Sequence, residues 1–383
     1  MSNTWWKDEG ELVKEQAELL NISPDDSVLI KGPPGSGKTN LLLLKANQLY
    51  LGERPNLHVV VFGSLLRNFI KQGGAQYKFP EEKVVTHAQL FTDILRAEGK
   101  DFDTKGMNLP AIRAERAKRL DALISDGRVG VQFEALLLDE AQDYSPLEIK
   151  LFRSLTEVLV ATADSRQKIY DVEDCDAELL KGMQHVHCLK YHFRNGLEIC
   201  RLADGLQKGR LDYSPMLEHS NYKEKDYKSS VLPKPGLSIE QQGAAIALQI
   251  KDQRFAYPDD LIGVLCPRNE EVDEIAVALT AAGYGDWITR ANQKDFDASK
   301  PIWLSTLSAA KGLEFRAVHI AGLDFLSRTG GAQRRLIYTG VTRAKTALTL
   351  YWTKTVPGYL QSALLVFDTK KVAVTKQNIF GKS

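Results

Sequence analysis

Short apolar runs alternate with longer amphipathic stretches along most of the chain. Runs of this kind suit strands that are buried on both faces, and the amphipathic stretches suit the helices that cover a sheet. The pattern therefore predicts an α/β protein with parallel sheets. We expect helices over residues such as 39–51, 146–154, 270–282 and 331–342. The expected strands fall into two sets of about five, at 27–31, 58–62, 83–86, 135–138 and 157–161, and then at 187–191, 262–266, 302–306, 317–321 and 348–352.

The two sets of strands predict two α/β domains in tandem. We place these domains at residues 1–188 and 189–383, although no segment rich in proline, glycine or serine marks the boundary. Two polar stretches, at 98–130 and 212–236, are interpreted as insertions or long connections between elements.

The charge balance and the cysteine content exclude several classes of protein. The 383 residues include 50 Lys and Arg against 49 Asp and Glu, so the net charge is +1. A basic field over the whole protein is therefore excluded, and a nucleic acid would have to bind to a local patch. The four cysteines have no CxxC spacing, which argues against a zinc module. No apolar run approaches the roughly 18 residues of a membrane span, so we expect a soluble, cytoplasmic protein.

The most specific motif is a glycine-rich loop between a predicted strand and a predicted helix. Residues 32–39 read GPPGSGKT, which fits the GxxxxGK[ST] pattern of phosphate-binding loops. In such a loop, backbone N–H groups surround a polyphosphate, the lysine reaches the β- and γ-phosphates, and the last hydroxyl binds Mg²⁺. The ATP-binding residues predicted here are Gly32, Pro33, Gly35, Ser36, Gly37, Lys38 and Thr39, and Thr39 is also a predicted Mg²⁺ ligand.

A second motif is an apolar strand that ends in carboxylates. Residues 135–143 read ALLLDEAQD. Asp139, at the end of the strand, is placed to hold Mg²⁺ opposite Thr39, and Glu140 is placed to orient and deprotonate an attacking water. Taken alone, such a strand end would more often precede a solvated helix. Its occurrence in the same predicted domain as the phosphate loop instead favours a nucleotide hydrolase.

Seven segments together resemble the motifs of superfamily 1 helicases of the UvrD/Rep type, in the order of that family. Besides the DEAQD run at 139–143, they are Gln16, VVTH at 84–87, ADSRQKIY at 163–170, LKYHFRNGLEI at 189–199, STLSAAKGLEF at 305–315 and RRLIYTGVTRAK at 334–345. The resemblance covers about residues 11–350. It implies two tandem RecA-like P-loop NTPase domains with parallel sheets, the first with a reduced insertion at about 97–131.

The resemblance also implies roles for individual residues in a cycle that depends on ATP and Mg²⁺. Gln16 would read the adenine, Phe193 would stack on it, and Glu314 would meet the ribose. Gln167 would sense the γ-phosphate. Arg194 and Arg343, in the second domain, would act as arginine fingers when the two domains close on ATP. Contacts with single-stranded nucleic acid are implied for Thr86 and His87, and Phe62, Ser64 and Tyr170 are further candidates.

The sequence departs from the family at several expected nucleic-acid contacts. Residues 171–174 read DVED, an acidic stretch without an aromatic side chain, where the family has a base-gripping Trp and Arg. Ser308 and Ala309 replace the family's histidine and serine in the 305–315 motif. The chain also has no room for the family's large accessory subdomains.

Two functions fit this combination of motifs. We predict an ATP-dependent translocase or helicase on single-stranded DNA, moving 3′ to 5′, with RNA left open as the substrate. A partner protein is expected to supply the missing accessory functions. The alternative is a regulatory nucleotide-switch ATPase subunit of a larger complex, with little or no unwinding activity.

Overall fold

The computed structural model describes residues 9–52, 54–63, 66–67, 70, 77–164, 166, 173–210, 213–291, 296–326 and 331–368. Its contacts divide the chain into two compact units. The first unit is Met1–Phe193 with Lys311–Leu313, and the second is Arg194–Ala310 with Glu314–Ser383. The contacts thus change at 193/194, whereas the sequence analysis places the boundary at 188/189. Among the described residues, no helix is both long and apolar enough to cross a membrane.

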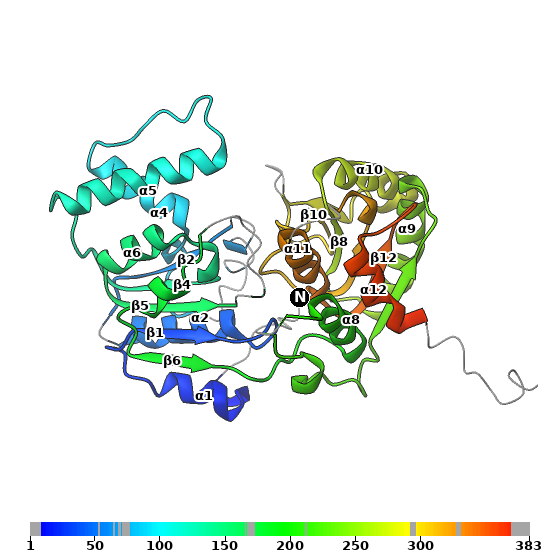
Figure 1. Cartoon of the computed structure of the whole chain (residues 1–383), viewed down its shortest axis with the longest axis horizontal. Helices are drawn as coiled ribbons and strands as arrows, with labels where there is room; N and C mark the ends of the chain where they lie inside the picture. The colour runs from blue at the N-terminus through cyan, green and yellow to red at the C-terminus, as the bar shows by residue number, and fades with distance from the viewer. Residues whose placement is uncertain are drawn as a thin grey trace, which may run out of the picture. The chain divides into compact units, whose positions relative to one another are not determined.

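The first unit is built on a six-stranded parallel sheet with the strand order β3-β2-β4-β5-β1-β6. Figure 1 shows β2, β4, β5, β1 and β6 side by side in this order. The strands are β1 (Val28–Lys31), β2 (Leu57–Val61), β3 (Val84–Thr86), β4 (Phe133–Leu138), β5 (Thr156–Ala163) and β6 (His185–Cys188). The helices are α1 (Lys14–Leu20), α2 (Lys38–Leu51), α4 (His87–Ala97), α5 (Leu109–Ser125), α6 (Pro146–Ser154) and α7 (Asp176–Leu180).

Both faces of this sheet are covered, because apolar side chains of successive strand residues point to opposite faces. In β4, Leu136 and Leu138 join a core with α4, α5 and α6. Ala135 and Leu137 join the opposite core, which contains the four leucines of α2 at 41–44 and Leu19 of α1. A strand that is apolar on both faces is typical of a parallel sheet in an α/β fold.

The second unit contains another six-stranded parallel sheet, with the order β7-β12-β11-β8-β10-β9. Its strands are β7 (Ser230–Lys234), β8 (Ile262–Cys266), β9 (Ile288–Arg290), β10 (Ile302–Thr306), β11 (Phe315–Ile320) and β12 (Ala344–Tyr351). Its helices are α8 (Leu197–Gln207), α9 (Ile239–Ala256), α10 (Asn269–Leu279), α11 (Gly331–Val341) and α12 (Gly358–Asp368). Helices α9 and α10 share one apolar core with the sheet, and α8 contacts α11, α12 and the β7 and β12 strands.

The predicted fold class is confirmed, with two parallel sheets typical of tandem RecA-like domains. One strand assignment is wrong. The apolar run predicted at 187–191 as the start of the second set corresponds to β6, which pairs with β1 in the first sheet. Strands β7 and β9 were not predicted, because β7 contains Pro233 at a sheet edge and β9 has only three residues. The stretch interpreted as a long connection at 98–130 contains the 17-residue helix α5.

Candidate nucleotide-binding site

The glycine-rich loop leads from β1 into α2, and its backbone requires glycine at several positions. Gly35 and Gly37 have φ angles of 73° and 88°, in the region that residues with a side chain rarely adopt. A Cβ atom on Gly32 would lie 2.8 Å from the Ser36 Oγ. That hydroxyl is buried and has no hydrogen-bond partner among the described atoms. The loop is therefore closely packed and keeps an unsatisfied polar atom, as a phosphate-binding loop would.

The lysine of the loop is buried and points back along the loop. Lys38 Nζ donates hydrogen bonds to the carbonyl oxygens of Gly32 (2.9 Å) and Pro33 (3.0 Å). Burial lowers the pKa of Lys38, and the nearby carboxylates of Asp164 and Glu140 oppose this shift. The ammonium group thus lies inside the loop, bound to neutral carbonyls that a phosphate oxygen could replace.

Gln16 braces the loop from α1. Its Nε2 donates to the Ser36 carbonyl oxygen at 2.9 Å, and its Oε1 accepts the Val13 N–H at 3.2 Å. The side chain is 2% exposed. Both ends of the amide are therefore used within the protein here, and adenine recognition by Gln16 stays a prediction.

Asp139 lies at the carboxyl end of β4 between two threonine hydroxyls. Thr39 Oγ1 donates to its Oδ2 at 2.9 Å, and Thr162 Oγ1, from β5, donates to its Oδ1 at 2.6 Å. Burial raises the pKa of Asp139, and the neighbouring Glu140 carboxylate adds to this effect. A carboxylate and a hydroxyl held together at the end of a phosphate loop are hard oxygen donors that suit Mg²⁺. The residues present therefore fit the predicted metal.

Glu140 has an unusual backbone conformation. Its φ of 52° is the only positive φ of a residue other than glycine in the described chain. This conformation costs roughly 1–2 kcal/mol, and the surroundings must hold it in place. The Glu140 N–H donates to Thr162 Oγ1 at 3.0 Å, and Gln142 Nε2 donates to the Glu140 carboxylate. The other end of the Gln142 amide accepts the Asp164 N–H at 2.9 Å.

A buried ion pair lies beside Glu140. Lys311 Nζ is 2.6 Å from Asp143 Oδ2 and 3.6 Å from Glu140 Oε2. By its contacts Lys311 belongs to the first unit, although the chain on either side of Lys311–Leu313 belongs to the second. Burial raises the pKa of Asp143 to about 6, while the adjacent Lys311 ammonium favours the ionised form.

In the second unit, the predicted arginine finger Arg194 is held by the predicted ribose-contacting residue. Arg194 Nε donates to Glu314 Oε2 at 2.7 Å, and Lys345 Nζ lies 2.6 Å from Glu314 Oε1. Burial would raise the pKa of Glu314, but the charges of Lys345 and Arg194 outweigh it and lower the pKa to about 2. Glu314 is thus a stable anion between two cations.

Arg343 and Phe193, which are also predicted to contact ATP, both donate hydrogen bonds to backbone carbonyl oxygens. Arg343 is 1% exposed, and its Nε donates to the Thr339 carbonyl oxygen at 3.0 Å. Phe193, at the end of the first unit, donates its backbone N–H to the Gly35 carbonyl oxygen at 3.0 Å. The backbone next to the predicted adenine-stacking ring is therefore joined directly to the phosphate loop.

Three of the predicted nucleic-acid residues are described, and each has contacts within the protein. The Thr86 hydroxyl caps α4 by accepting the Gln89 N–H. The His87 ring is stacked on Phe62 at a centroid distance of 4.9 Å, and both rings also pack on Tyr144. Burial lowers the pKa of His87 to about 4, so the ring is neutral near pH 7. The remaining predicted residues Ser64 and Tyr170, and also Gln167, lie outside the described residues.

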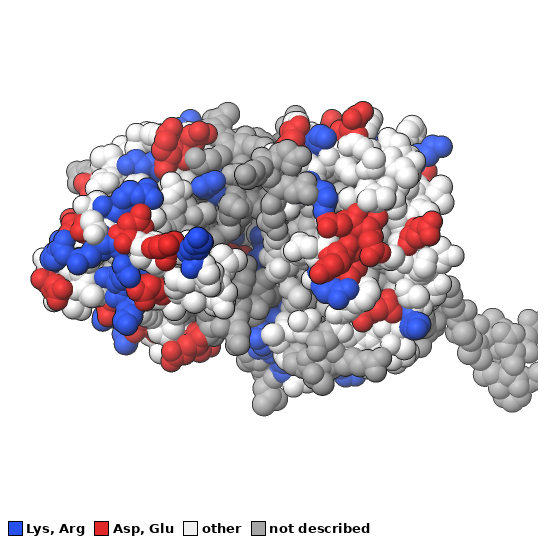
Figure 2. Space-filling view, turned by 90° about the horizontal axis from the view of Figure 1, so that it is seen from above, with Lys and Arg blue, Asp and Glu red and all other residues white. Residues whose placement is uncertain are grey.

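The exposed charges of the first unit do not form a patch of one sign on the face seen in Figure 2, where basic and acidic side chains are interleaved. The α5 residue Arg119 pairs with Glu115 at 2.7 Å, and Lys150 of α6 pairs with Asp121 at 3.1 Å. On the second unit, acidic side chains gather on α10, where Glu270, Asp273 and Glu274 are exposed. Neither of these surfaces matches the local basic patch expected for nucleic acid.

Sequence reasoning did not assign roles to Thr162, Gln142, Lys311, Asn195 or Lys345. Gln142 lies in the DEAQD run at 139–143, and Lys311 and Lys345 lie in the helicase-like segments at 305–315 and 334–345, so the sequence pointed to their neighbourhood. Thr162 gave no signal, because it lies in an otherwise apolar strand and acts on residues more than 20 positions away.

Part of the chain is similar to a known protein family. Residues 301–351, which span β10 to β12 and include Glu314 and Arg343, match the model of the UvrD-like helicase C-terminal domain. No curated protein sequence matches the chain.

Two similar solved structures illustrate the comparison. The PRRSV helicase is 17% identical with a TM-score of 0.39, over 88% of this chain and 54% of that one, so the chain spans about half the length of that helicase. The C-terminal domain of a possible DNA helicase from Lactobacillus plantarum WCFS1 is 20% identical with a TM-score of 0.33, over 45% of this chain and 93% of that one. Residues 301–351 are thus similar to the UvrD-like helicase C-terminal domain.

Proposed function

We propose that this protein hydrolyses ATP in a Mg²⁺-dependent manner at the phosphate loop of the first unit. The observation that carries the proposal is the Thr39–Asp139–Thr162 arrangement, which joins the loop to the strand end next to Glu140. A binding-only module has no need of a carboxylate in the position of Glu140.

The residues of the first unit have distinct roles in this proposal. The loop amides and Lys38 bind the β- and γ-phosphates, and Ser36 offers its unpartnered hydroxyl. Thr39 and Asp139 would hold Mg²⁺, which when bound supplies positive charge against the phosphates. Glu140 takes a proton from the attacking water, and Thr162 and Gln142 hold the backbone and the carboxylate of Glu140 in place.

We further propose that Arg194 and Arg343 act as arginine fingers toward the γ-phosphate. A single arginine finger raises the rate of hydrolysis by about 10³–10⁵. Glu314 is paired with Arg194 in the present structure, so this pair has to be exchanged for a phosphate contact when Arg194 acts.

The experiment that tests hydrolysis compares the turnover of ATP by the wild type with that of Lys38→Ala and Glu140→Gln. We expect Glu140→Gln to bind ATP but not to turn it over, and Lys38→Ala to lose both binding and turnover. Wild-type turnover in both variants would refute the proposed enzyme.

We propose that the ATPase drives translocation on single-stranded DNA, as an activity of the helicase type. The alternative, a nucleotide-controlled switch in a larger complex, is favoured by the acidic residues 171–174 and by the internal packing of Phe62 and His87. Hydrolysis measured with and without single-stranded DNA or RNA separates the two. Strong stimulation supports the motor, and its absence supports the switch.

A further inference from the structure

Asn195 lies between the predicted arginine finger Arg194 and Gly196, the N-cap residue of α8. Its side chain is completely buried. The Nδ2 atom donates to two backbone carbonyl oxygens, those of Thr342 at 3.0 Å and Ala344 at 2.7 Å. These two carbonyls belong to the residues immediately before and after Arg343, so one amide group holds the chain on both sides of that arginine.

The chemistry of this contact requires an amide. Carbonyl oxygens only accept hydrogen bonds, so the atom that faces them must carry two N–H donors. The amide oxygen of Asn195 is buried and has no partner among the described atoms. A buried oxygen without a partner stabilises nothing, so the contribution of this side chain rests on its two N–H groups.

The surrounding contacts join the same two segments of the second unit. The Gly196 N–H donates to the Lys345 carbonyl oxygen at 2.9 Å. Glu314 connects Arg194 to the Lys345 side chain, and the Phe315 N–H donates to the Arg343 carbonyl oxygen at 3.0 Å. Arg343 itself lies in the two-residue turn between α11 and β12, where its N–H donates to the Gly340 carbonyl oxygen at 3.1 Å and its Nε to that of Thr339 at 3.0 Å.

We propose that Asn195 is a positioning residue for Arg343. Its carboxamide fixes the two peptide units from which the Arg343 side chain projects, and it ties their position to that of Arg194. The proposal rests on the proposed function, in which Arg343 acts on the γ-phosphate. Asn195 touches no reacting group in this scheme and acts only through Arg343.

The test is Asn195→Asp, which keeps the size of the side chain and removes both donors. A misplacement of about 1 Å in a catalytic group costs roughly 10²-fold in rate, so we expect kcat to fall by about that factor. The KM for ATP should stay near the wild-type value, because the phosphate loop is in the first unit.

The matched control is Gln242→Glu, the same amide-to-acid change at a buried position of the second unit. Gln242 is 1% exposed, and its Nε2 donates to the Leu237 carbonyl oxygen at 2.9 Å. This variant should lose stability without losing kcat. An equal fall in kcat for Gln242→Glu and Asn195→Asp would overturn the proposal, since both would then report general damage to the second unit.

A double-mutant cycle with Arg343→Ala separates the possible failures. If Asn195 acts through Arg343, adding Asn195→Asp to Arg343→Ala causes no further loss of kcat. A further loss equal to that of the single variant overturns the positioning role, as does wild-type kcat in Asn195→Asp. Wild-type kcat in Arg343→Ala contradicts instead the proposed role of Arg343. If Asn195→Asp does not fold, Asn195→Ser, which keeps one donor, should show a smaller loss of kcat that again disappears in the Arg343→Ala background.

Discussion

Thr162 offers the sharpest test of how the first unit positions its two acidic residues. Its single hydroxyl donates to Asp139 at 2.6 Å and accepts the Glu140 N–H at 3.0 Å. The side chain is completely buried in β5. The change Thr162→Val removes the hydroxyl and keeps the branched shape, which suits a strand equally well. Thr162→Ser is the matched control, because it keeps the hydroxyl and loses only a methyl group.

The cost of Thr162→Val follows from the two hydrogen bonds that it removes. A hydrogen bond to a charged group contributes about 1.5–3 kcal/mol, and a buried donor left without a partner costs about 1–3 kcal/mol. Because Asp139 keeps its bond from Thr39, the two terms overlap, and we expect a loss of roughly 2–4 kcal/mol in the stability of the first unit. If half of that energy holds Glu140 in its strained conformation during catalysis, kcat falls by about 10-fold, since roughly 1.4 kcal/mol corresponds to a factor of ten.

Hydrogen exchange of the β4 and β5 amides measures the stability locally, and steady-state ATP hydrolysis measures kcat. A local probe is needed because two units can unfold separately, and a single global unfolding curve then has no simple meaning. Our reasoning would be refuted by Thr162→Val with wild-type stability and kcat. It would also be refuted if Thr162→Ser lost as much as Thr162→Val.

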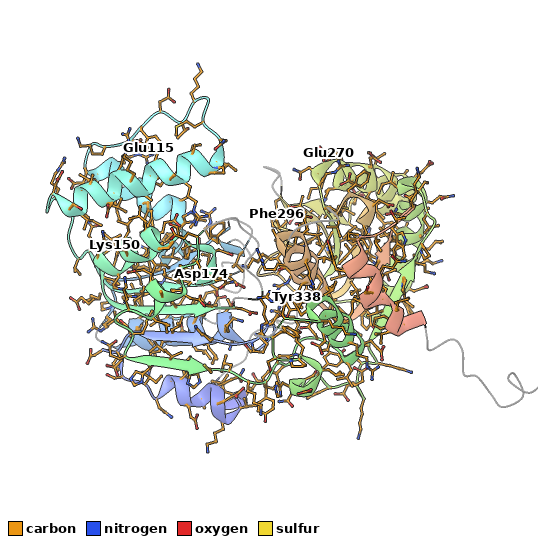
Figure 3. All side chains as sticks on the ribbon, viewed as in Figure 1. Glu115, Lys150, Asp174, Glu270, Phe296 and Tyr338 are labelled. Atoms are coloured by element: carbon orange, nitrogen blue, oxygen red, sulfur yellow. The ribbon has the colours of Figure 1, made fainter. Side chains whose placement is uncertain are left out.

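Two more predictions concern buried charges. Lys311→Ala leaves Asp143 buried without its ion-pair partner, and we expect a loss of about 3–5 kcal/mol in the stability of the first unit, measured by hydrogen exchange of its amides. Lys150→Ala, which breaks an exposed pair on an outer helix, should cost no more than about 1 kcal/mol, and an equal loss in both would contradict the argument. Figure 3 shows Lys150 on α6. Because the pKa of Glu314 is lowered from 4.5 to about 2, its ionised form contributes stability above pH 4.5 that is lost as the pH falls toward 2. Glu314→Gln should remove this part of the acid dependence when hydrogen exchange of the second unit's amides is followed as a function of pH, and an unchanged pH profile would show that the ion pairs contribute nothing.

The parts that could be predicted from sequence are local in the chain. The phosphate loop needs a strand, a loop of six residues and a helix in succession, and the acidic motif needs only an apolar strand with carboxylates at its end. These patterns located Lys38, Thr39, Asp139 and Glu140 at the ends of β1 and β4. The alternation of strands and helices likewise predicted the fold class.

The parts that could not be predicted depend on which segments meet in space. The run at 187–191 shows a strand pattern, but the pattern does not say which strand is its partner, and β6 joins the first sheet rather than the second. Lys311 is 168 positions from Asp143, and Asn195 is more than 140 positions from the two carbonyls that it holds.

The charges of the two units differ in a way that bears on how a nucleotide would bind. Among the described residues around the phosphate loop, the carboxylates of Asp139, Glu140, Asp143 and Asp164 are buried close together, near Lys38, Lys311 and Arg166. A polyphosphate brings more negative charge to these four carboxylates. The first unit alone therefore favours nucleotide binding only together with a further cation, which Mg²⁺ would supply at Thr39 and Asp139. In the second unit, by contrast, the Glu314 carboxylate lies between two cations, 2.7 Å from Arg194 Nε and 2.6 Å from Lys345 Nζ. Arg194 can therefore move to a phosphate only by giving up its pair with Glu314, and the strength of that pair sets how readily the proposed exchange occurs.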